Sequence, residues 1–264
     1  MTRPIVIEHK TPLNEAALLD LINACPKELH SLYRSDIRRV LWQIRFIIER
    51  MASDIDLMDV GGGTSLFPVV LGASGIKTTV VDWFETEWSS VSESFNREML
   101  ERVFPQLGIR AIHADVVHDQ GPFMPNSVDV ITSFDSMEHW HDSPKATLHA
   151  MTRALRSGGL FFLGVPNCVN IRKRVTVPLG YGKWSDMTTF YEQARFFGHV
   201  REYDVDDLLY IARDLDLSRV EIIGKNWMGY ANHRQIVRTI TPFVDRLLQF
   251  RPGLCSDIYL VGYR

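Results

Sequence analysis

A short apolar run that ends in three consecutive glycines, between Leu57 and Leu66, constrains the fold more than any other part of the sequence. The glycines let the backbone turn sharply, adopt positive φ and approach a ligand closely. Thr64 and Ser65 are good caps for a following helix, whose first backbone N–H groups would point back at the loop. The stretch is typical of a strand, an anion-binding loop and a helix in series.

After Asp56, short β-rich runs alternate with helical segments, an order that predicts a parallel sheet with crossover helices. The expected class is α/β: a doubly wound, Rossmann-like, mostly parallel seven-stranded sheet with helices on both faces. An N-terminal helical extension would precede the sheet, and a lid would be inserted after the fifth strand. The predicted strands are Leu57–Val60, Lys77–Asp82, Ile109–Asp115, Val128–Phe134, Leu160–Pro166, Arg219–Gly224 and Asp257–Tyr263.

Helical periodicity completes the outline. The predicted helices are Leu13–Cys25, Glu28–Met51, Thr86–Phe104, Pro144–Arg156, Asp204–Leu215 and Tyr230–Phe250, the fourth of them closed by a glycine cap at Ser157, Gly158 and Gly159. We therefore expect a helical extension at 1–52 and one main domain at 53–264. Within that domain, 167–203 is rich in basic, aromatic and glycine residues and predicts a lid or substrate loop, and 226–256 predicts a helical insertion.

Composition excludes several classes of protein. The 264 residues carry a formal net charge of -3, which gives no global reason to expect nucleic-acid binding. Cys25, Cys168 and Cys255 are far apart and form no CxxC pair, so neither a disulfide framework nor a zinc site is indicated. No segment approaches the length of a membrane span, so we expect a cytoplasmic monomer or homodimer without stable membrane insertion.

Two basic helices keep more than one interpretation. The arginines of the second helix are either its solvated face or a site for an acidic ligand; they are Arg34, Arg38, Arg39, Arg45 and Arg50. The helix Tyr230–Phe250 sets arginines beside an apolar face. That face would cover the sheet, meet a second subunit or make peripheral contact with an anionic membrane.

Acidic residues stand at the ends of four predicted strands: Asp59, Asp82, Asp115 and Asp135. In an open parallel sheet, ligands bind at these carboxyl ends. Asp82 lies nineteen residues after Gly63, the separation at which a carboxylate accepts hydrogen bonds from ribose hydroxyls. Leu66 replaces the last glycine of a dinucleotide motif, and Asp59 would repel a pyrophosphate but attract an ammonium group. The pattern favours S-adenosylmethionine over a dinucleotide.

Two stretches carry a resemblance to a known family. Met58–Thr64, and Ser133–His139 followed by Arg153–Leu160, resemble the class I S-adenosylmethionine-dependent methyltransferases, in their small-molecule branch. The resemblance covers the chain from about Asp56 onward, and Ser65 replaces the third glycine of the family's first motif. It identifies 53–264 as the methyltransferase domain and implies S-adenosylmethionine as the cofactor, with S-adenosylhomocysteine as the product.

The resemblance also implies roles for individual residues in cofactor binding. The methionyl part would meet Asp59, Gly61, Gly62 and Gly63, with Asp135 near its ammonium group. Asp82 would accept the ribose hydroxyls and Asp115 the adenine amino group. Val116 would pack on the adenine, and Trp83 would lie against it or serve as an ordinary half-buried aromatic residue.

The acceptor side is expected around two histidines. The candidate general bases are His139, His141 and His199, because imidazole titrates near neutral pH. The other interpretations are a structural hydrogen bond within the Glu138–His139 turn for His139, turn chemistry with Asp142 for His141, and a brace at a helix N-terminus for His199. The candidate substrate-binding residues are His139, Trp184, Tyr191, His199, Arg201 and Tyr203. Glu138, His139, His141 and Asp142 crowd into one loop without the spacing of a known metal site, so no metal is expected.

The sequence thus predicts metal-independent, in-line methyl transfer to an oxygen or nitrogen of a small-molecule or glycan-type acceptor, within glycan or secondary-metabolite biosynthesis. Two alternatives stay open. One is an NAD(P)-dependent oxidoreductase, and the other is a noncatalytic module that keeps the cofactor-binding fold.

Overall fold

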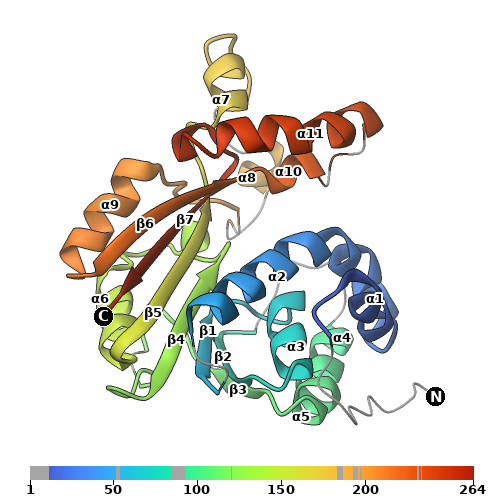
Figure 1. The fold of residues 1–264 in the computed structure, drawn as a ribbon, viewed down its shortest axis with the longest axis vertical. Coiled ribbons are helices and arrows are strands. Elements are labelled where there is room, and N and C mark those ends of the chain that lie inside the picture. The colour runs from blue at the N-terminus through green and yellow to red at the C-terminus, as the bar shows by residue number, and fades with distance from the viewer. Residues whose placement is uncertain are drawn as a thin grey trace.

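The computed structural model describes residues 12–51, 54–84, 93–119, 121–182, 187–192, 196, 198–230, 232 and 234–264. A single seven-stranded sheet runs through this part of the chain (Figure 1). Its strands are β1 (Asp56–Val60), β2 (Lys77–Asp82), β3 (Arg110–His113), β4 (Val128–Phe134), β5 (Leu155–Pro166), β6 (Ser218–Lys225) and β7 (Asp257–Tyr263).

The strand order is β3-β2-β1-β4-β5-β7-β6. The first five strands are mutually parallel, whereas β7 runs antiparallel to both β5 and β6. The order reverses between β1 and β4, and this switch point is where an open sheet leaves a crevice for a ligand. The predicted doubly wound, mostly parallel seven-stranded sheet is confirmed.

Alternating strand residues supply the cores on the two faces of the sheet. Leu57, Val80 and Phe162 point to one face, and their neighbours Met58, Val81 and Phe161 point to the other. The first face is covered by α1 (Glu15–Asn23), α2 (His30–Arg50), α3 (Leu66–Ala73) and η2 (Met99–Val103); the second is covered by α6 (Lys145–Ala154) and α9 (Val205–Asp214). Helices therefore lie on both faces, as predicted.

The remaining helices are short or lie at the edges of the sheet. They are η1 (Lys27–Leu29), α4 (Glu93–Glu98), α5 (Phe104–Gln106), η3 (Met137–His139), α7 (Ile171–Thr176), α8 (Met187–Glu192), α10 (Trp227–Tyr230), α11 (Gln235–Leu248) and η4 (Pro252–Leu254). Thus the described part of the 167–203 segment contains two short helices, and the described part of the predicted helix Thr86–Phe104 begins at Glu93. No helix in the described part of the chain is long and apolar enough to cross a bilayer.

The N-terminal helices are built into the main core. Asn14 caps α1 by accepting a hydrogen bond from the Ala17 backbone N–H at 3.0 Å. The apolar stripe of α2 packs into the same cluster as β1 and α3, and the Tyr33 hydroxyl donates to the Thr64 carbonyl in the glycine loop. The position of that loop therefore depends on α2 as well as on the sheet.

Two predicted helix caps are wrong. Helix α6 ends at Ala154, and Gly158 belongs to β5, where its N–H donates to the Arg264 carbonyl at 2.9 Å. Pairing with the end of the chain thus extends the strand where a helix cap was expected. At the start of α3, the Ser65 side chain makes no capping bond, and the Thr64 hydroxyl donates instead to Asn96 at 3.0 Å.

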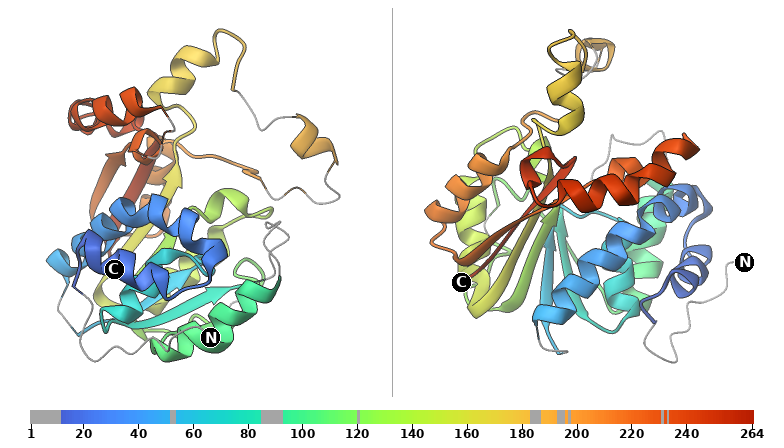
Figure 2. Two further views of the ribbon diagram at one scale, coloured as in Figure 1. Left: turned by 90° about the vertical axis from the view of Figure 1, so that its right-hand side faces the viewer. Right: turned by 45° about the horizontal axis from the view of Figure 1, so that its top comes forward.

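Helix α11 turns its polar side inward. Asp245 is buried and accepts hydrogen bonds from the Asn226 amide at 2.8 Å and the Tyr230 hydroxyl at 3.1 Å. Phe243 and Leu247 are 74% and 71% exposed. The apolar face therefore does not cover the sheet, and that interpretation is wrong. Helices α7 and α11 lie together at one end of the molecule, beyond the carboxyl end of β5 (Figures 1 and 2).

Candidate functional site

A pocket of about 150 Å³ lies at the carboxyl ends of β1, β2 and β4, beside the segment that follows β3. Six residues singled out in the sequence share its wall: Gly61, Asp82, Trp83, Asp115, Val116 and His139. Val117, His118, Ser136, Trp140, His141 and Asp142 complete the lining. The topology thus gathers side chains from four strand ends around one cavity.

The glycine loop is held so tightly that side chains are excluded. A Cβ on Gly61, whose φ is +74°, would lie 1.8 Å from the Ser136 hydroxyl oxygen. A Cβ on Gly62 would lie 1.8 Å from the Asp59 carboxylate. Gly63 also has a positive φ, +53°. Only glycine allows this backbone to lie between β1 and the segment after β4 while still facing the pocket.

Asp59 lies beneath the loop and does not line the pocket. Its side chain is buried, and one carboxylate oxygen accepts a hydrogen bond from the Thr132 hydroxyl at 2.7 Å. The other oxygen has no hydrogen-bond partner among the described residues. Burial raises the pKa of Asp59 to about 7, with Thr132 opposing and the nearby Asp82 adding to that rise. Asp59 therefore supports the loop from below.

Asp82 ties the end of β2 to the loop. One of its oxygens accepts from the Gly63 N–H at 3.0 Å, and the other accepts from the Phe84 N–H at 2.7 Å. Burial raises the pKa of Asp82 against these hydrogen bonds. A carboxylate has further lone pairs, so Asp82 can also accept from hydroxyl groups in the pocket that it lines.

Asp115 is fixed by the turn that follows β3. It accepts from the backbone N–H groups of Val117 at 3.0 Å and His118 at 3.2 Å, and it pairs with the His118 ring at 2.9 Å. Although burial raises the pKa of Asp115, these hydrogen bonds give a net lowering. Val116 is packed in the core below. The carboxylate is thus held in its ionised form on the pocket wall.

Asp135 is paired with a residue from the N-terminal helices. The carboxylate, on a residue with φ of +48°, binds the guanidinium of Arg39, which also contacts Asp36 at 3.1 Å. Although burial lowers it, these two aspartates raise the pKa of Arg39 above its ordinary range. The solvated-face interpretation is therefore wrong for Arg39, since this side chain bridges α2 to the end of β4.

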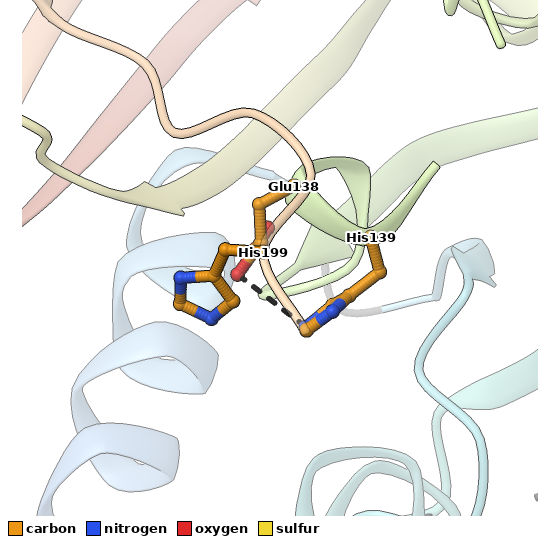
Figure 3. Close-up of side chains that lie close together, drawn as sticks. All are labelled: Glu138, His139 and His199. Atoms are coloured by element: carbon orange, nitrogen blue, oxygen red, sulfur yellow. Dashed lines mark ion pairs between the residues drawn. The ribbon is translucent and has the colours of Figure 1, made fainter. Parts of the chain in front are cut away.

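Glu138, His139 and His199 form a compact group beside the pocket (Figure 3). The two imidazole rings meet edge to face with centroids 4.9 Å apart. The Nδ1 atom of His139 lies 3.2 Å from the Gly198 carbonyl oxygen, and that of His199 lies 2.8 Å from Glu202. Although burial raises it, hydrogen bonds from His199 and Lys173 lower the pKa of Glu202 to about 2.

Other candidate substrate residues lie apart from this pocket. Arg201 and Tyr203 line a second cavity of about 260 Å³ between α6 and α9, and Arg201 pairs with Asp207 at 3.1 Å. Burial raises the pKa of Tyr203 to about 12. Tyr191 is 76% exposed on α8, and Trp184 lies outside the described residues. Among the candidates that the structure describes, His139 therefore lies together only with His199.

Sequence reasoning missed two residues that shape the pocket. Ser136 contacts the glycine loop, and its hydroxyl accepts a hydrogen bond from the Trp140 indole N–H at 3.0 Å. Ser136 follows Asp135 directly and Trp140 lies in the same short segment, so their position after a strand end was the available signal. A cavity of about 660 Å³ also exists at the amino ends of β1 and β2, lined by Asp56, Lys77 and Arg110. It contains none of the predicted site residues.

The donor set of the small pocket fits an adenosine-type ligand. Two carboxylates at neighbouring strand ends, Asp82 and Asp115, can accept from hydroxyl and amino groups. Trp83 and Val116 offer apolar surface for a base, and the backbone of Gly61 is open to close approach. The buried carboxylate of Asp59 next to the loop disfavours a pyrophosphate, as the sequence predicted.

Comparisons with known proteins agree with this assignment. Residues 29–222 match the family model described as a methyltransferase domain. No curated protein matches the chain. Similar solved structures include an S-adenosylmethionine-dependent methyltransferase of Archaeoglobus fulgidus. It is 13% identical over 90% of this chain and 98% of its own, with a TM-score of 0.55.

Two further structures share the fold. A Thermotoga maritima S-adenosylmethionine-dependent methyltransferase, described as a possible histamine N-methyltransferase, is 13% identical over 93% of this chain and 99% of its own, with a TM-score of 0.56. Phosphoethanolamine N-methyltransferase 2 of Haemonchus contortus, solved with S-adenosylmethionine, is 14% identical over 86% of this chain and 52% of its own, with a TM-score of 0.52.

These findings confirm the resemblance to class I methyltransferases and S-adenosylmethionine as the cofactor, and they decide against the oxidoreductase and the noncatalytic module. The family model spans well over half of the chain and includes the glycine loop and the Glu138–His139 segment. The chain therefore belongs to the methyltransferase domain family and is an enzyme with the fold of S-adenosylmethionine-dependent methyltransferases.

Proposed function

We propose that this enzyme methylates an oxygen or nitrogen atom of a small-molecule or sugar-containing acceptor. The observation that carries the proposal is the position of His139, whose side chain lines the cofactor pocket and stands against His199. A polar acceptor group entering from this side would meet imidazole nitrogens next to the methyl donor. The net charge of -3 supports a small acceptor over a nucleic acid.

On the cofactor side, we assign Asp82 to the ribose hydroxyls and Asp115 to the adenine amino group. Trp83 and Val116 would enclose the adenine ring. The backbone of the glycine loop would face the methionyl part, with Asp59 holding the loop from below. The ion pair with Arg39 makes Asp135 a residue that positions the end of β4.

S-adenosylmethionine supplies a methyl group on a positively charged sulfur, which is already activated for direct transfer. The protein's main task is then to position the acceptor, and a near-attack geometry removes about 7 to 11 kcal/mol of the barrier. A general base adds about 10² to 10⁴ in rate when the acceptor is a hydroxyl. We place His139 in contact with the acceptor and His199 behind it.

The class of acceptor can be tested with methyl-labelled S-adenosylmethionine. The purified enzyme is incubated with the labelled donor and a cell extract divided into small-molecule, protein and nucleic-acid fractions. We expect label only in the small-molecule fraction, and much less label with Asp82→Ala at a donor concentration that the wild type needs for half its maximal rate. Transfer to the protein or nucleic-acid fraction would refute the proposed acceptor class.

A further inference from the structure

Glu138 is a buried acidic residue with an unsatisfied oxygen. Only 1% of its surface is exposed, and its Oε2 atom has no hydrogen-bond partner among the described residues. A buried carboxylate oxygen without a hydrogen-bond partner destabilises the folded state by several kcal/mol, about as much as the loss of a hydrogen bond to a charged group. A cation held by this carboxyl group would supply the missing partner.

The two histidines beside Glu138 are each held through the same ring nitrogen, Nδ1. The Nδ1 of His139 contacts the Gly198 carbonyl, and the Nδ1 of His199 contacts the Glu202 carboxylate. Both partners are oxygens that accept, so a hydrogen bond to them uses the Nδ1–H of each ring, and a metal ion would be bound through Nε2. Histidines that bind metals are oriented in this way, with the second nitrogen donating to a carbonyl or carboxylate oxygen.

The third side chain is brought in by a fixed backbone contact. The N–H of Val200 donates to the Glu138 carbonyl at 2.7 Å, which holds the segment around His199 against η3. One ligand atom from each of Glu138, His139 and His199 lies within 4.8 Å of the others, and the Glu138 Oε1 to His139 Nε2 distance is 4.0 Å. Figure 3 shows the carboxyl group between the two rings in this view.

This spacing is close to that of ligands around one ion. Two donors bonded to a metal at about 2.1 Å lie at most about 4.2 Å apart. The side chain of His199 is 36% exposed, so a small rotation can close the remaining gap. The cluster is therefore near a binding geometry without any movement of the sheet.

We propose that Glu138, His139 and His199 bind one divalent transition-metal ion at the edge of the cofactor pocket. Two imidazole nitrogens and one carboxylate oxygen suit ions such as Zn²⁺, Co²⁺ or Mn²⁺ better than Mg²⁺ or Ca²⁺, which take oxygen ligands. Glu202, itself bound to Lys173, orients the His199 ring. Three protein ligands leave a coordination position for an outside group.

This inference departs from the metal-free site expected from the sequence. That expectation considered Glu138, His139, His141 and Asp142, which crowd into one loop. In the structure the His141 ring instead contacts the Phe196 carbonyl at 2.9 Å, and the third ligand is His199, from a distant segment.

The role of the ion rests on the proposed function, whereas its binding does not. With the ion bound, His139 would be one of its ligands and not a general base, and a hydroxyl of the acceptor bound to the ion would have a lowered pKa. Its proton would leave to solvent and its oxygen would form the new bond to the methyl carbon. The electron pair of the broken carbon–sulfur bond would remain on sulfur, which gives S-adenosylhomocysteine.

The test is a titration of chelator-treated enzyme with Co²⁺, followed by calorimetry and by the visible absorption of the ion. We expect one ion per chain, with a spectrum of nitrogen and oxygen ligands in low coordination number. Glu138→Gln and His199→Gln should each weaken binding by about 100-fold or more, and Glu202→Gln should weaken it by about 10- to 100-fold. His141→Gln, from the same loop, should bind like the wild type.

Calorimetry with S-adenosylhomocysteine on the same variants separates loss of the metal site from loss of folding. Variants that still bind this ligand but not Co²⁺ would support the ligand set. Failure of the wild type to bind one ion per chain, or equal binding by Glu138→Gln and His199→Gln, would overturn the metal site. If only His141→Gln lost the ion, the ligand set would be wrong. Absence of S-adenosylhomocysteine binding with Co²⁺ binding intact would refute only the proposed function.

Discussion

The carboxylate of Asp82 has two functions in the candidate site. It holds the Gly63 N–H of the loop and faces the pocket in which ribose hydroxyls are expected. Its removal should therefore loosen the loop and delete hydrogen bonds to the ligand. A hydrogen bond to a charged group contributes about 1.5 to 3 kcal/mol. For Asp82→Ala we predict a dissociation constant for S-adenosylhomocysteine about 10- to 100-fold higher, measured by calorimetry.

Asp206→Ala is the matched control for that measurement. Asp206 is an exposed residue of α9, on the opposite face of the sheet from the glycine loop. Its replacement should leave the affinity for S-adenosylhomocysteine unchanged. An Asp82→Ala variant that bound the ligand as tightly as Asp206→Ala would remove the ribose assignment.

The buried Asp59 makes stability depend on pH. Burial raises its pKa to about 7 in the folded protein, against about 4 in the unfolded chain. The folded state thus binds the proton more tightly, so this group's stabilisation is complete below about pH 4 and is lost as the pH rises to about 7. We predict that Asp59→Asn, which keeps the shape without the charge, reduces the loss of stability between pH 5 and pH 8.

The measurement is urea unfolding of wild type and Asp59→Asn at both pH values, without ligand. Asp257, whose pKa burial also raises to about 7, contributes equally to both proteins and cancels in the difference. An identical change in the free energy of unfolding for the two proteins would show that Asp59 titrates normally.

At the level of residues, the sequence predicted those site residues whose position depends only on the strand that they follow. Gly61 and Asp82 stand next to strand ends, where the topology of a parallel sheet decides what they face. Glu138 and His199 are far apart in sequence, and a hydrogen bond between backbone groups brings them together. No local pattern specifies such a pairing. The ion pair of Arg39 could not be predicted either, since its partner Asp135 belongs to another element.

Helix α2 links the N-terminal part of the chain to the candidate site. Arg39 is largely buried and joins Asp36 on its own helix to Asp135 at the end of β4. Loss of one partner from a buried ion pair leaves a charge without compensation. We predict that Arg39→Ala lowers the free energy of unfolding by about 2 to 3 kcal/mol in urea denaturation.

Arg38→Ala tests whether that effect is specific to the ion pair between Arg39 and Asp135. Arg38 is the next residue of α2, is exposed and lies over the Tyr230 ring at 5.5 Å. Its loss should change stability by about 0.5 to 1 kcal/mol at most. Equal effects of the two substitutions would mean that the contact with Asp135 is not what stabilises the helix.

Helix α11 differs from α2 because its apolar face lies outside the core. Phe243 is 74% exposed, whereas Phe162 in β5 is fully buried. We predict that Phe243→Ser changes the free energy of unfolding of the isolated protein by less than about 0.5 kcal/mol. Phe162→Ala should cost about 3 to 5 kcal/mol. A large loss of stability from Phe243→Ser would show that the face is covered in solution.

At the level of elements, the strands were predicted well because parallel strands buried on both faces are apolar almost throughout. The ends of helices were predicted less well. Gly158 pairs with the last residue of the chain, a long-range contact that overrides its preference for a helix cap. The inward side of α11 was missed because Asp245 finds three hydrogen-bond donors, from Asn226, Tyr230 and Gln249, that periodicity alone cannot indicate.

At the scale of the whole molecule, the carboxyl ends of the strands form one edge of the sheet, and both the proposed cofactor site and the proposed acceptor site lie there. The pocket that we propose for the cofactor opens at the switch point between β1 and β4, and Glu138 of the proposed metal site lies in the short helix after β4. The N-terminal helices fix this edge from one side through Tyr33 and Arg39. Binding of a ligand in the pocket therefore joins elements from distant parts of the chain.

This arrangement predicts that the cofactor product stabilises the entire fold. Since the proposed binding site is formed by the ends of several strands and exists only in the folded state, S-adenosylhomocysteine at about 100 times its dissociation constant should add about 2.7 kcal/mol. For a chain of this size that corresponds to a rise in melting temperature of about 5 to 10 °C. Differential scanning fluorimetry measures it, with NADH at the same concentration as the control. A rise with NADH but not with S-adenosylhomocysteine would contradict the cofactor assignment.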